Sequence, residues 1–140
     1  MSAFKFRLER VLNVRGIFEE RAKHEWALQE RAAREERDKL ARLQKQEQEI
    51  KDFGHADFDV ERRQATYSFL TILKGRIEKQ TQRVREQEEM AQKAKEAWLV
   101  ARQETKKVST LKEKQYASFV KEQERKEQKV LDDMRSHLNT

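Results

Sequence analysis

Hydrophobic positions recur every three and four residues through the second half of the chain. The series runs through Leu70, Leu73, Ile77, Gln80, Val84, Gln87, Ala91, Ala94, Trp98, Ala101, Thr105 and Val108. Nine of these twelve positions are apolar, and nearly everything between them is polar. Steps of three and four average about 3.5 residues, so the stripe stays on one face only if the helix supercoils left-handedly around a partner. The pattern therefore predicts a coiled-coil helix.

The first half of the chain carries a weaker stripe of the same kind. It runs through Phe4, Leu8, Val11, Arg15, Phe18, Ala22, Trp26, Gln29, Ala33, Glu36, Leu40, Leu43, Glu47 and Ile50. The step of four from Ala22 to Trp26 interrupts the alternation and is typical of a stutter, which locally unwinds a supercoil. We expect a second helix that shares its stripe with the first.

One segment between the two stripes is rich in helix-breaking residues, the stretch KDFGHADFD at residues 51–59. Gly54 can adopt the left-handed conformation that ends many helices. Either Asp57 or Asp59 can cap the following helix, because a carboxylate is favoured at the positive helix N-terminus. The segment predicts a turn.

Gly16 and Gly75 lie inside continuing patterns, so we expect each to lower helix stability by about 1 kcal/mol without ending the helix. The fold class is therefore all-α, a long antiparallel two-helix coiled-coil hairpin in which the second helix overhangs the first. We expect a single coiled-coil domain with these boundaries: domain 1–140, helix one about 3–51, turn about 52–58 and helix two about 59–138.

The length difference between the helices predicts the pairing and the overhang. Folding at about residue 55 brings together positions whose numbers add to about 110, so Leu40 lies near Leu70, and Trp98 near Leu12. At 1.5 Å per residue, roughly the last 30 residues of helix two extend beyond helix one. This overhang keeps apolar residues that need another molecule, namely Leu111, Phe119, Val120, Val130, Leu131, Met134 and Leu138.

Composition agrees with helices that bury a narrow stripe. Only 36% of the residues are hydrophobic and 41% are charged, while proline and cysteine are absent. Strong helix formers are abundant, which argues against disorder. No apolar run approaches the roughly 20 residues that span a bilayer, so we expect a soluble protein.

The residues that could carry chemistry do not form a site. None of His24, His55 and His137 has a histidine or cysteine at chelating spacing, and no glycine-rich phosphate loop occurs. A two-helix rod also lacks the cleft that an acid-base pair requires. We therefore expect no catalysis, no metal and no cofactor.

The basic N-terminal segment AFKFRLERVLNVR, residues 3–15, allows several interpretations. Its composition resembles an organelle transit peptide or a membrane-surface helix, but its apolar spacing continues into Phe18 and Ala22. The net charge of +6 suggests nucleic acid, yet Lys and Arg alternate with Glu along the chain. We expect no nucleic-acid partner; the alternatives are a generic scaffold coiled coil, or a basic amphipathic helix that binds membrane or nucleic acid.

Apolar side chains also gather just after the turn. Leu70 and Leu73 belong to the stripe, whereas Phe69 and Ile72 lie partly outside it. Exposed apolar groups on a polar rod supply binding energy, so this is the best internal candidate for a docking patch.

The first half of the chain resembles a known family in its opening residues, FKFRLERVLNVRGIFEERAKHE, positions 4–25. This order of an aromatic residue, Leu, Val-Leu and Arg, followed by Glu and Ala, is similar to the start of the flagellar export protein FliJ family. The resemblance covers nearly the whole chain. It implies a non-enzymatic stalk of the bacterial type III export apparatus, cytoplasmic and peripheral at the inner membrane, with a chaperone-like role.

The resemblance also implies partners. Family members insert their helical ends into the hexameric export ATPase ring, which promotes its assembly, and they contact the cytoplasmic domain of the export gate. The expected ATPase-binding residues are Leu8, Val11, Leu12 and Arg15. The expected gate-binding residues are Phe69, Leu73, Arg76 and Gln80 on helix two, within FLTILKGRIEKQ, and Lys39, Leu43, Gln46 and Ile50 on helix one. Export chaperones and a weak homo-oligomer are further partners that this interpretation allows.

Two of the expected gate-binding residues, Leu73 and Gln80, belong also to the apolar stripe. Either the stripe rotates slightly there, or these two side chains are half buried.

Overall fold

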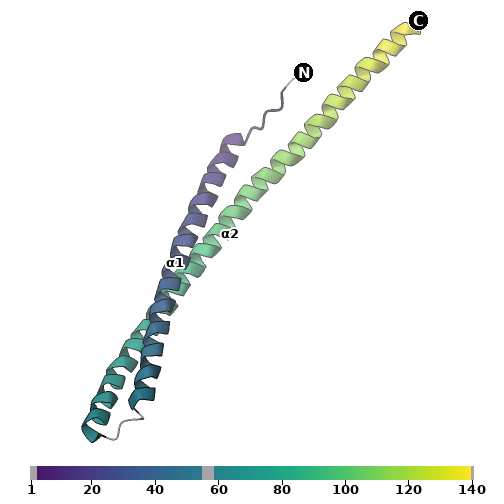
Figure 1. The fold of residues 1–140 in the computed structure, drawn as a ribbon. Helices are drawn as coiled ribbons and strands as arrows, with labels where there is room; N and C mark the ends of the chain where they lie inside the picture. Colours follow the sequence, from purple (N-terminus) through teal and green to yellow (C-terminus); the bar gives the residue numbers. More distant parts are fainter. Residues whose placement is uncertain (1–2, 55–58, 140) are drawn as a thin grey trace. The chain divides into compact units, whose positions relative to one another are not determined.

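The computed structural model describes residues 3–54 and 59–139, nearly all of them in two long helices (Figure 1). Helix α1 spans Glu9–Gly54 and helix α2 spans Val60–Leu138. The two helices pack against each other, and no strand occurs in the described residues. The expected all-α helical hairpin is confirmed. Neither α1 nor α2 contains a stretch long and apolar enough to cross a bilayer.

The first helix begins later than predicted. Residues 3–6 have no regular structure and residues 7–8 form a turn, so helix one does not start near residue 3. Apolar Phe4, Phe6 and Leu8 alternate with charged residues, a period-two pattern that suits an extended segment better than a helix. The later start of α1 follows from this alternation.

The residues around the predicted turn end α1 and begin α2. Asp59 caps α2, because its Oδ1 accepts a hydrogen bond from the Glu61 backbone N–H at 3.0 Å. Asp57, the alternative cap, lies outside the described residues. Gly54 is the last residue of α1, beyond the predicted end at residue 51.

The expected left-handed conformation of Gly54 is wrong, because no described glycine has a positive φ. Gly54 serves a close approach of the helices instead. A Cβ built at Gly54 would lie 2.8 Å from Cγ2 of Thr66. The missing side chain therefore lets the start of α2 pack against the end of α1.

The predicted stripe of α2 is confirmed at every position from Leu70 to Val108, each of which is buried or half-buried. Leu73 is the largest fully buried side chain, with 1% exposure, so Leu73→Ala would cost about 2–5 kcal/mol. The stripe of α1 is confirmed in the same way from Ala22 to Ile50. These positions form the seam, the face that each helix turns towards the other.

The first turns of α1 depart from the predicted stripe. The positions expected there, Val11, Arg15 and Phe18, are exposed, and the less exposed side chains are instead Leu12, Gly16 and Glu19. Steps of four, four and three from Leu8 average about 3.7 residues, close to the period of a straight helix. Helix α1 therefore needs no left-handed supercoil over these turns, and its inward face is rotated by one residue.

The contacts divide the structure into two compact units. The distal unit, as we name it, combines the described parts of Met1–Glu20 and Leu99–Thr140, and the hairpin unit comprises the described part of Arg21–Trp98. Each unit contains one segment of each helix.

The pairing in the hairpin unit differs from the predicted one. Trp98 stacks on Trp26, with ring centroids 5.1 Å apart, where Leu12 was the predicted neighbour. Helix α1 continues to Gly54 and α2 starts only at Val60, so the turn is centred later than residue 55. Helical side chains also point towards the N-terminus of their own helix. The two residues that meet at a given height therefore both have higher residue numbers than the backbone positions at that height. These two effects shift the pairing in the observed direction.

In the distal unit, the extended N-terminal segment covers part of the predicted overhang. The Phe4 ring packs against Tyr116 and Phe119, at 5.3 and 5.5 Å between centroids, and Phe6 is only 8% exposed. An extended segment rises about 3.3 Å per residue, against about 1.5 Å in a helix, so a few residues reach far along α2. Continuous exposure of α2 begins only near residue 121, interrupted at Gln123. The overhang is therefore shorter than the predicted 30 residues.

We expect Gly75→Ala to raise the free energy of unfolding by about 1 kcal/mol, because alanine has the higher helix propensity. Gly75 is exposed inside α2, and a Cβ there meets nothing within 4 Å. Urea unfolding followed by circular dichroism measures the change. Gly54→Ala is the control for steric room. Its Cβ would displace Thr66, and this should cancel the gain in the free energy of unfolding. Equal stabilisation by both substitutions would contradict the close packing at Gly54.

Candidate functional site

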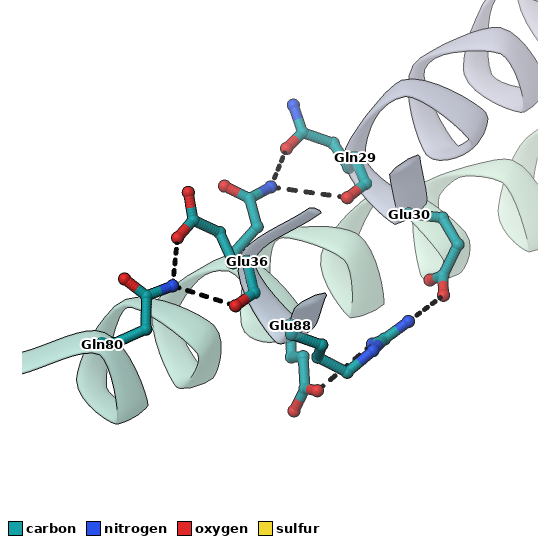
Figure 2. Close-up of polar contacts among 7 residues, drawn as sticks. Gln29, Glu30, Glu36, Gln80 and Glu88 are labelled. Atoms are coloured by element: carbon teal, nitrogen blue, oxygen red, sulfur yellow. Dashed lines mark hydrogen bonds and ion pairs between the residues drawn. The ribbon is translucent and has the colours of Figure 1, made fainter. Parts of the chain in front are cut away.

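Two glutamines of α2, buried Gln80 and half-buried Gln87, hydrogen-bond across the seam of the hairpin unit (Figure 2). Gln80, 5% exposed, donates from Nε2 to the backbone oxygen of Glu36 at 2.9 Å and also to its carboxylate. Gln87 Nε2 donates to Oε1 of Gln29 at 2.6 Å. A buried amide is costly unless it is paired, so these bonds favour one pairing of the helices over shifted ones.

The Gln80 hydrogen bond also changes the electrostatics of Glu36. Because this bond favours the charged carboxylate, it lowers the pKa of Glu36 below its ordinary value of 4.5. Nearby Lys39 and Arg83 lower the pKa further by their positive charge. Glu36 therefore stays ionised in the seam.

One flank of the hairpin unit neutralises its own charges. Arg37 on α1 contacts Glu88 on α2 at 3.2 Å and Glu30 on α1 at 3.3 Å (Figure 2). Hydrogen bonds to Glu88 and Glu30 raise the pKa of Arg37. All three side chains are more than 40% exposed, so solvent screens each pair and its contribution to stability is small. We name this flank the paired flank, because the charge of Arg37 is shared there by two acids.

The structure separates the expected gate-binding residues of α2 into two groups. Leu73 and Gln80 are buried, with 1% and 5% exposure. Both alternatives considered for them, a rotated stripe and half burial, are therefore wrong. Phe69 is 41% exposed, and Arg76 is also exposed. A partner that approaches the closed hairpin can contact Phe69 and Arg76 directly, whereas Leu73 and Gln80 hold the helices together beneath it.

The expected gate-binding residues of α1 divide in the same way. Leu43 and Ile50 are half-buried in the seam, and Lys39 and Gln46 are exposed. In each helix, therefore, two of the four expected residues belong to the seam and two are open to a partner.

A groove brings several of these residues together beside the seam. It has a volume of about 220 Å³ and is lined by Leu43, Arg76, Lys79, Gln80 and Arg83. Lys79 and Arg83 were not among the sequence expectations. Their signal was the spacing of three and four that runs through Phe69, Ile72 and Arg76 into these two residues. The groove is therefore bordered by one helical line of exposed side chains, on the flank that we name the basic flank.

The expected ATPase-binding residues lie in the distal unit, on α1 and just before it. Leu8 and Leu12 are half-buried, while Val11 is 39% exposed and Arg15 is exposed. The rotation of the first turns also exposes three apolar residues whose exposure the sequence analysis did not predict, namely Val14, Ile17 and Phe18. Together with Val11 they form the N-terminal apolar strip. Phe18 was missed because the predicted stripe placed it in the seam.

The end of α2 carries a second apolar surface in the distal unit. Val130, Leu131 and Met134 are each more than half exposed. With Lys126 and Glu127 they line a shallow cavity of about 430 Å³ on this single helix. The apolar character predicted for the end of helix two is therefore present at the surface.

The described residues contain no group of three or more His, Asp or Glu side chains placed to hold a metal ion. Of the three histidines, His24 and His137 lie on α1 and α2, and His55 is outside the described residues.

Comparison with known proteins gives one match. The family model described as "Flagellar FliJ protein" matches residues 4–139, nearly the whole chain. No curated protein and no solved structure matches the chain.

We expect Gln80→Ala to reduce the pH dependence of stability. The pKa of Glu36 is lowered in the folded state, so its contribution is present above pH 4.5 and is lost as the pH falls through the lowered pKa. The stability difference between the wild type and Gln80→Ala should therefore be largest at neutral pH and shrink in acid. Urea unfolding at a series of pH values measures it.

Gln87→Ala is the matched control, because Gln87 donates to Gln29, a side chain that does not titrate. Its stability difference should stay constant over the same pH range. Parallel curves for Gln80→Ala and Gln87→Ala would contradict the assigned role of Gln80.

Proposed function

The chain belongs to the FliJ family of flagellar proteins, and from this premise we propose that it is the stalk that links the export ATPase to the export gate. Membership in the family makes it a component of the bacterial flagellar export apparatus. In our proposal the protein acts without catalysis, at the cytoplasmic side of the inner membrane. Its distal unit enters the hexameric ATPase ring, and its hairpin unit contacts the cytoplasmic domain of the gate.

The N-terminal apolar strip is the observation that carries this proposal. Val11, Val14, Ile17 and Phe18 are each between 39% and 52% exposed on successive turns of α1. Contiguous exposed apolar side chains are typical of protein interaction sites. Arg15 adds a cation beside the strip, so the surface suits a partner with apolar and acidic groups.

The gate contact is supported by the basic flank of the hairpin unit. Phe69 and Arg76 are exposed on one line of α2, and Arg76 borders the groove that Leu43 lines from α1. A large aromatic residue beside an arginine is the composition that dominates binding energy at interfaces. Leu73 contributes by keeping the two helices in place under this surface.

Two additional partners follow from the surfaces of the distal unit. The apolar cavity at Val130, Leu131 and Met134 offers a site to an export chaperone, or to a second copy of the chain in a weak homo-oligomer. The ATPase ring covers the N-terminal apolar strip in this proposal and leaves these contacts secondary.

We expect Val11→Asp to reduce stimulation of the cognate export ATPase at least tenfold, because a charge replaces an apolar contact in the ring. A steady-state assay of phosphate release measures this stimulation. Val11 is 39% exposed, so the variant should keep its helical circular dichroism.

The matched control for Val11→Asp is Val60→Asp, which makes the same chemical change at the start of α2, where Val60 is 74% exposed. Val60→Asp should stimulate the ATPase as the wild type does. Undiminished stimulation by Val11→Asp would rule out the N-terminal apolar strip as the ATPase contact.

We expect Phe69→Ala to weaken binding to the purified gate domain about tenfold or more, since aromatic anchors at interfaces contribute about 2 kcal/mol or more. Isothermal titration calorimetry measures the affinity, and ATPase stimulation should be unchanged. Tyr67→Ala is the control, because Tyr67 is an exposed aromatic residue of α2 two positions before Phe69 and therefore on a different face of the helix. Equal affinity of the Phe69→Ala variant and the wild type would refute this gate contact.

A further inference from the structure

Three cations, Arg76, Lys79 and Arg83, line the groove of the hairpin unit. Within the described parts of the chain, none of the three forms an ion pair. Arg83 acts on the carboxylate of Glu36 by its charge, but Glu36 already accepts the hydrogen bond of Gln80 and pairs with Lys39 at 3.5 Å. The groove therefore carries net positive charge.

Other exposed cations of the hairpin unit differ from these three in their surroundings. Arg37 is shared by two carboxylates, those of Glu30 and Glu88. In the described residues, Arg34, Lys74 and Arg85 form no ion pair either, but they do not line the groove. Arg76, Lys79 and Arg83 are therefore distinguished by their gathering at one groove.

Exposed apolar side chains continue the same helical line. Phe69 and Ile72 precede Arg76 at spacings of three and four, and they are 41% and 57% exposed. Positions three and four apart lie on one face of a helix. The basic flank therefore has an apolar end near the start of α2 and a cationic end at the groove.

We propose that the basic flank binds an acidic protein segment. Carboxylates of the segment pair with Arg76, Lys79 and Arg83, and one aliphatic or aromatic side chain of the segment packs against Phe69 and Ile72. Charge complementarity carries this assignment, because unpaired cations beside a groove lower the energy of an approaching anion and speed its association. The inference rests on the proposed function only for the protein that supplies the segment, which is then the export gate.

A protein segment fits this surface better than a membrane or a nucleic acid does. From Arg76 to Arg83 the three cations cover seven steps along one helix, about 10 Å at 1.5 Å per residue. Nucleic-acid sites usually show a longer basic stripe, and membrane-surface helices have a broad apolar face opposite their cations. Here acids border the cations: Glu78 is next to Lys79 in the sequence, and Glu86 continues the same helical line three residues beyond Arg83. A short acidic segment can follow the line from Arg76 to Arg83 if it ends before Glu86.

The test uses a fluorescein-labelled synthetic peptide of Glu-Glu-Leu repeats and the full-length protein. Fluorescence anisotropy should show binding that weakens as salt rises, because exposed ion pairs are screened. The same peptide with Lys in place of Glu should not bind, and the peptide with Ser in place of Leu should bind more weakly. Binding of all three peptides alike would overturn the proposal.

The decisive comparison is between two triple variants with the same loss of charge. Arg76→Gln, Lys79→Gln and Arg83→Gln together should weaken the Glu-Glu-Leu peptide at least about fivefold, since each exposed pair contributes modestly. The matched control is Arg34→Gln, Lys74→Gln and Arg85→Gln, three exposed cations of the same unit that do not line the groove. The control should change the affinity less than twofold. Equal losses in both triples would show that net charge, and not this groove, binds the peptide.

Two competitors test the other classes of ligand. The first competitor is phosphatidylserine vesicles and the second is a DNA duplex. A competitor that displaces the peptide from the wild type, and that no longer binds the groove triple variant, would overturn the proposal in favour of that ligand. Absence of competition is the expected result.

A titration with the gate domain separates this inference from the proposed function. If Phe69→Ala weakens gate binding but the groove triple variant and added salt do not, the proposed acidic segment is refuted and the gate contact stands. If the groove triple loses the peptide while the gate domain binds neither the wild type nor any variant, the groove stands and the gate contact is wrong.

Discussion

A hairpin of two helices can bury only one stripe of each helix, and this geometric limit shapes the rest of the molecule. The fully buried hydrophobic residues in the described parts of the chain are few, and only Leu73 among them is both large and completely covered. Any large apolar side chain off the stripe must stay at the surface. The N-terminal apolar strip and the pair Phe69 and Ile72 are therefore products of the same limit that makes the seam thin.

The two flanks of the seam show how such a rod acquires distinct surfaces without a cleft. Arg37 of α1 is paired with Glu30 on its own helix and with Glu88 of α2, whereas Arg76 and Lys79 form no ion pair in the described residues. A change of acid at a few exposed positions would therefore alter a docking surface with little effect on the fold, because exposed pairs contribute little to stability. In the proposed function, the seam holds the helices together and the exposed row beside it contacts the partner.

Periodicity predicted most of the fold, because in a two-helix hairpin the spacing of the apolar residues determines the seam. Every seam position of α2 from Leu70 onwards and of α1 from Ala22 onwards followed from it. The prediction failed where a second period competed: Phe4, Phe6 and Leu8 alternate as in an extended segment, and the steps after Leu8 favour a straight helix. The pairing of Trp98 with Trp26 was also missed, since it depends on where the turn lies and on the direction of the indole side chains. For the proposed docking surface, spacing placed Phe69 outside the stripe and the family resemblance added Arg76, but the groove that Lys79 and Arg83 line also includes Leu43 of α1 and so depends on how the helices pair.

The glutamine hydrogen bonds in the seam have a mechanical consequence. Aliphatic side chains tolerate a displacement along the helix axis as long as they meet other aliphatic groups, but Gln80 and Gln87 each require one acceptor at one height on α1. Sliding α1 past α2 by a single turn would break both bonds and leave the buried amide of Gln80 and the half-buried amide of Gln87 unpaired. The hairpin unit therefore resists axial shear, so a push applied to one helix loads the other as well.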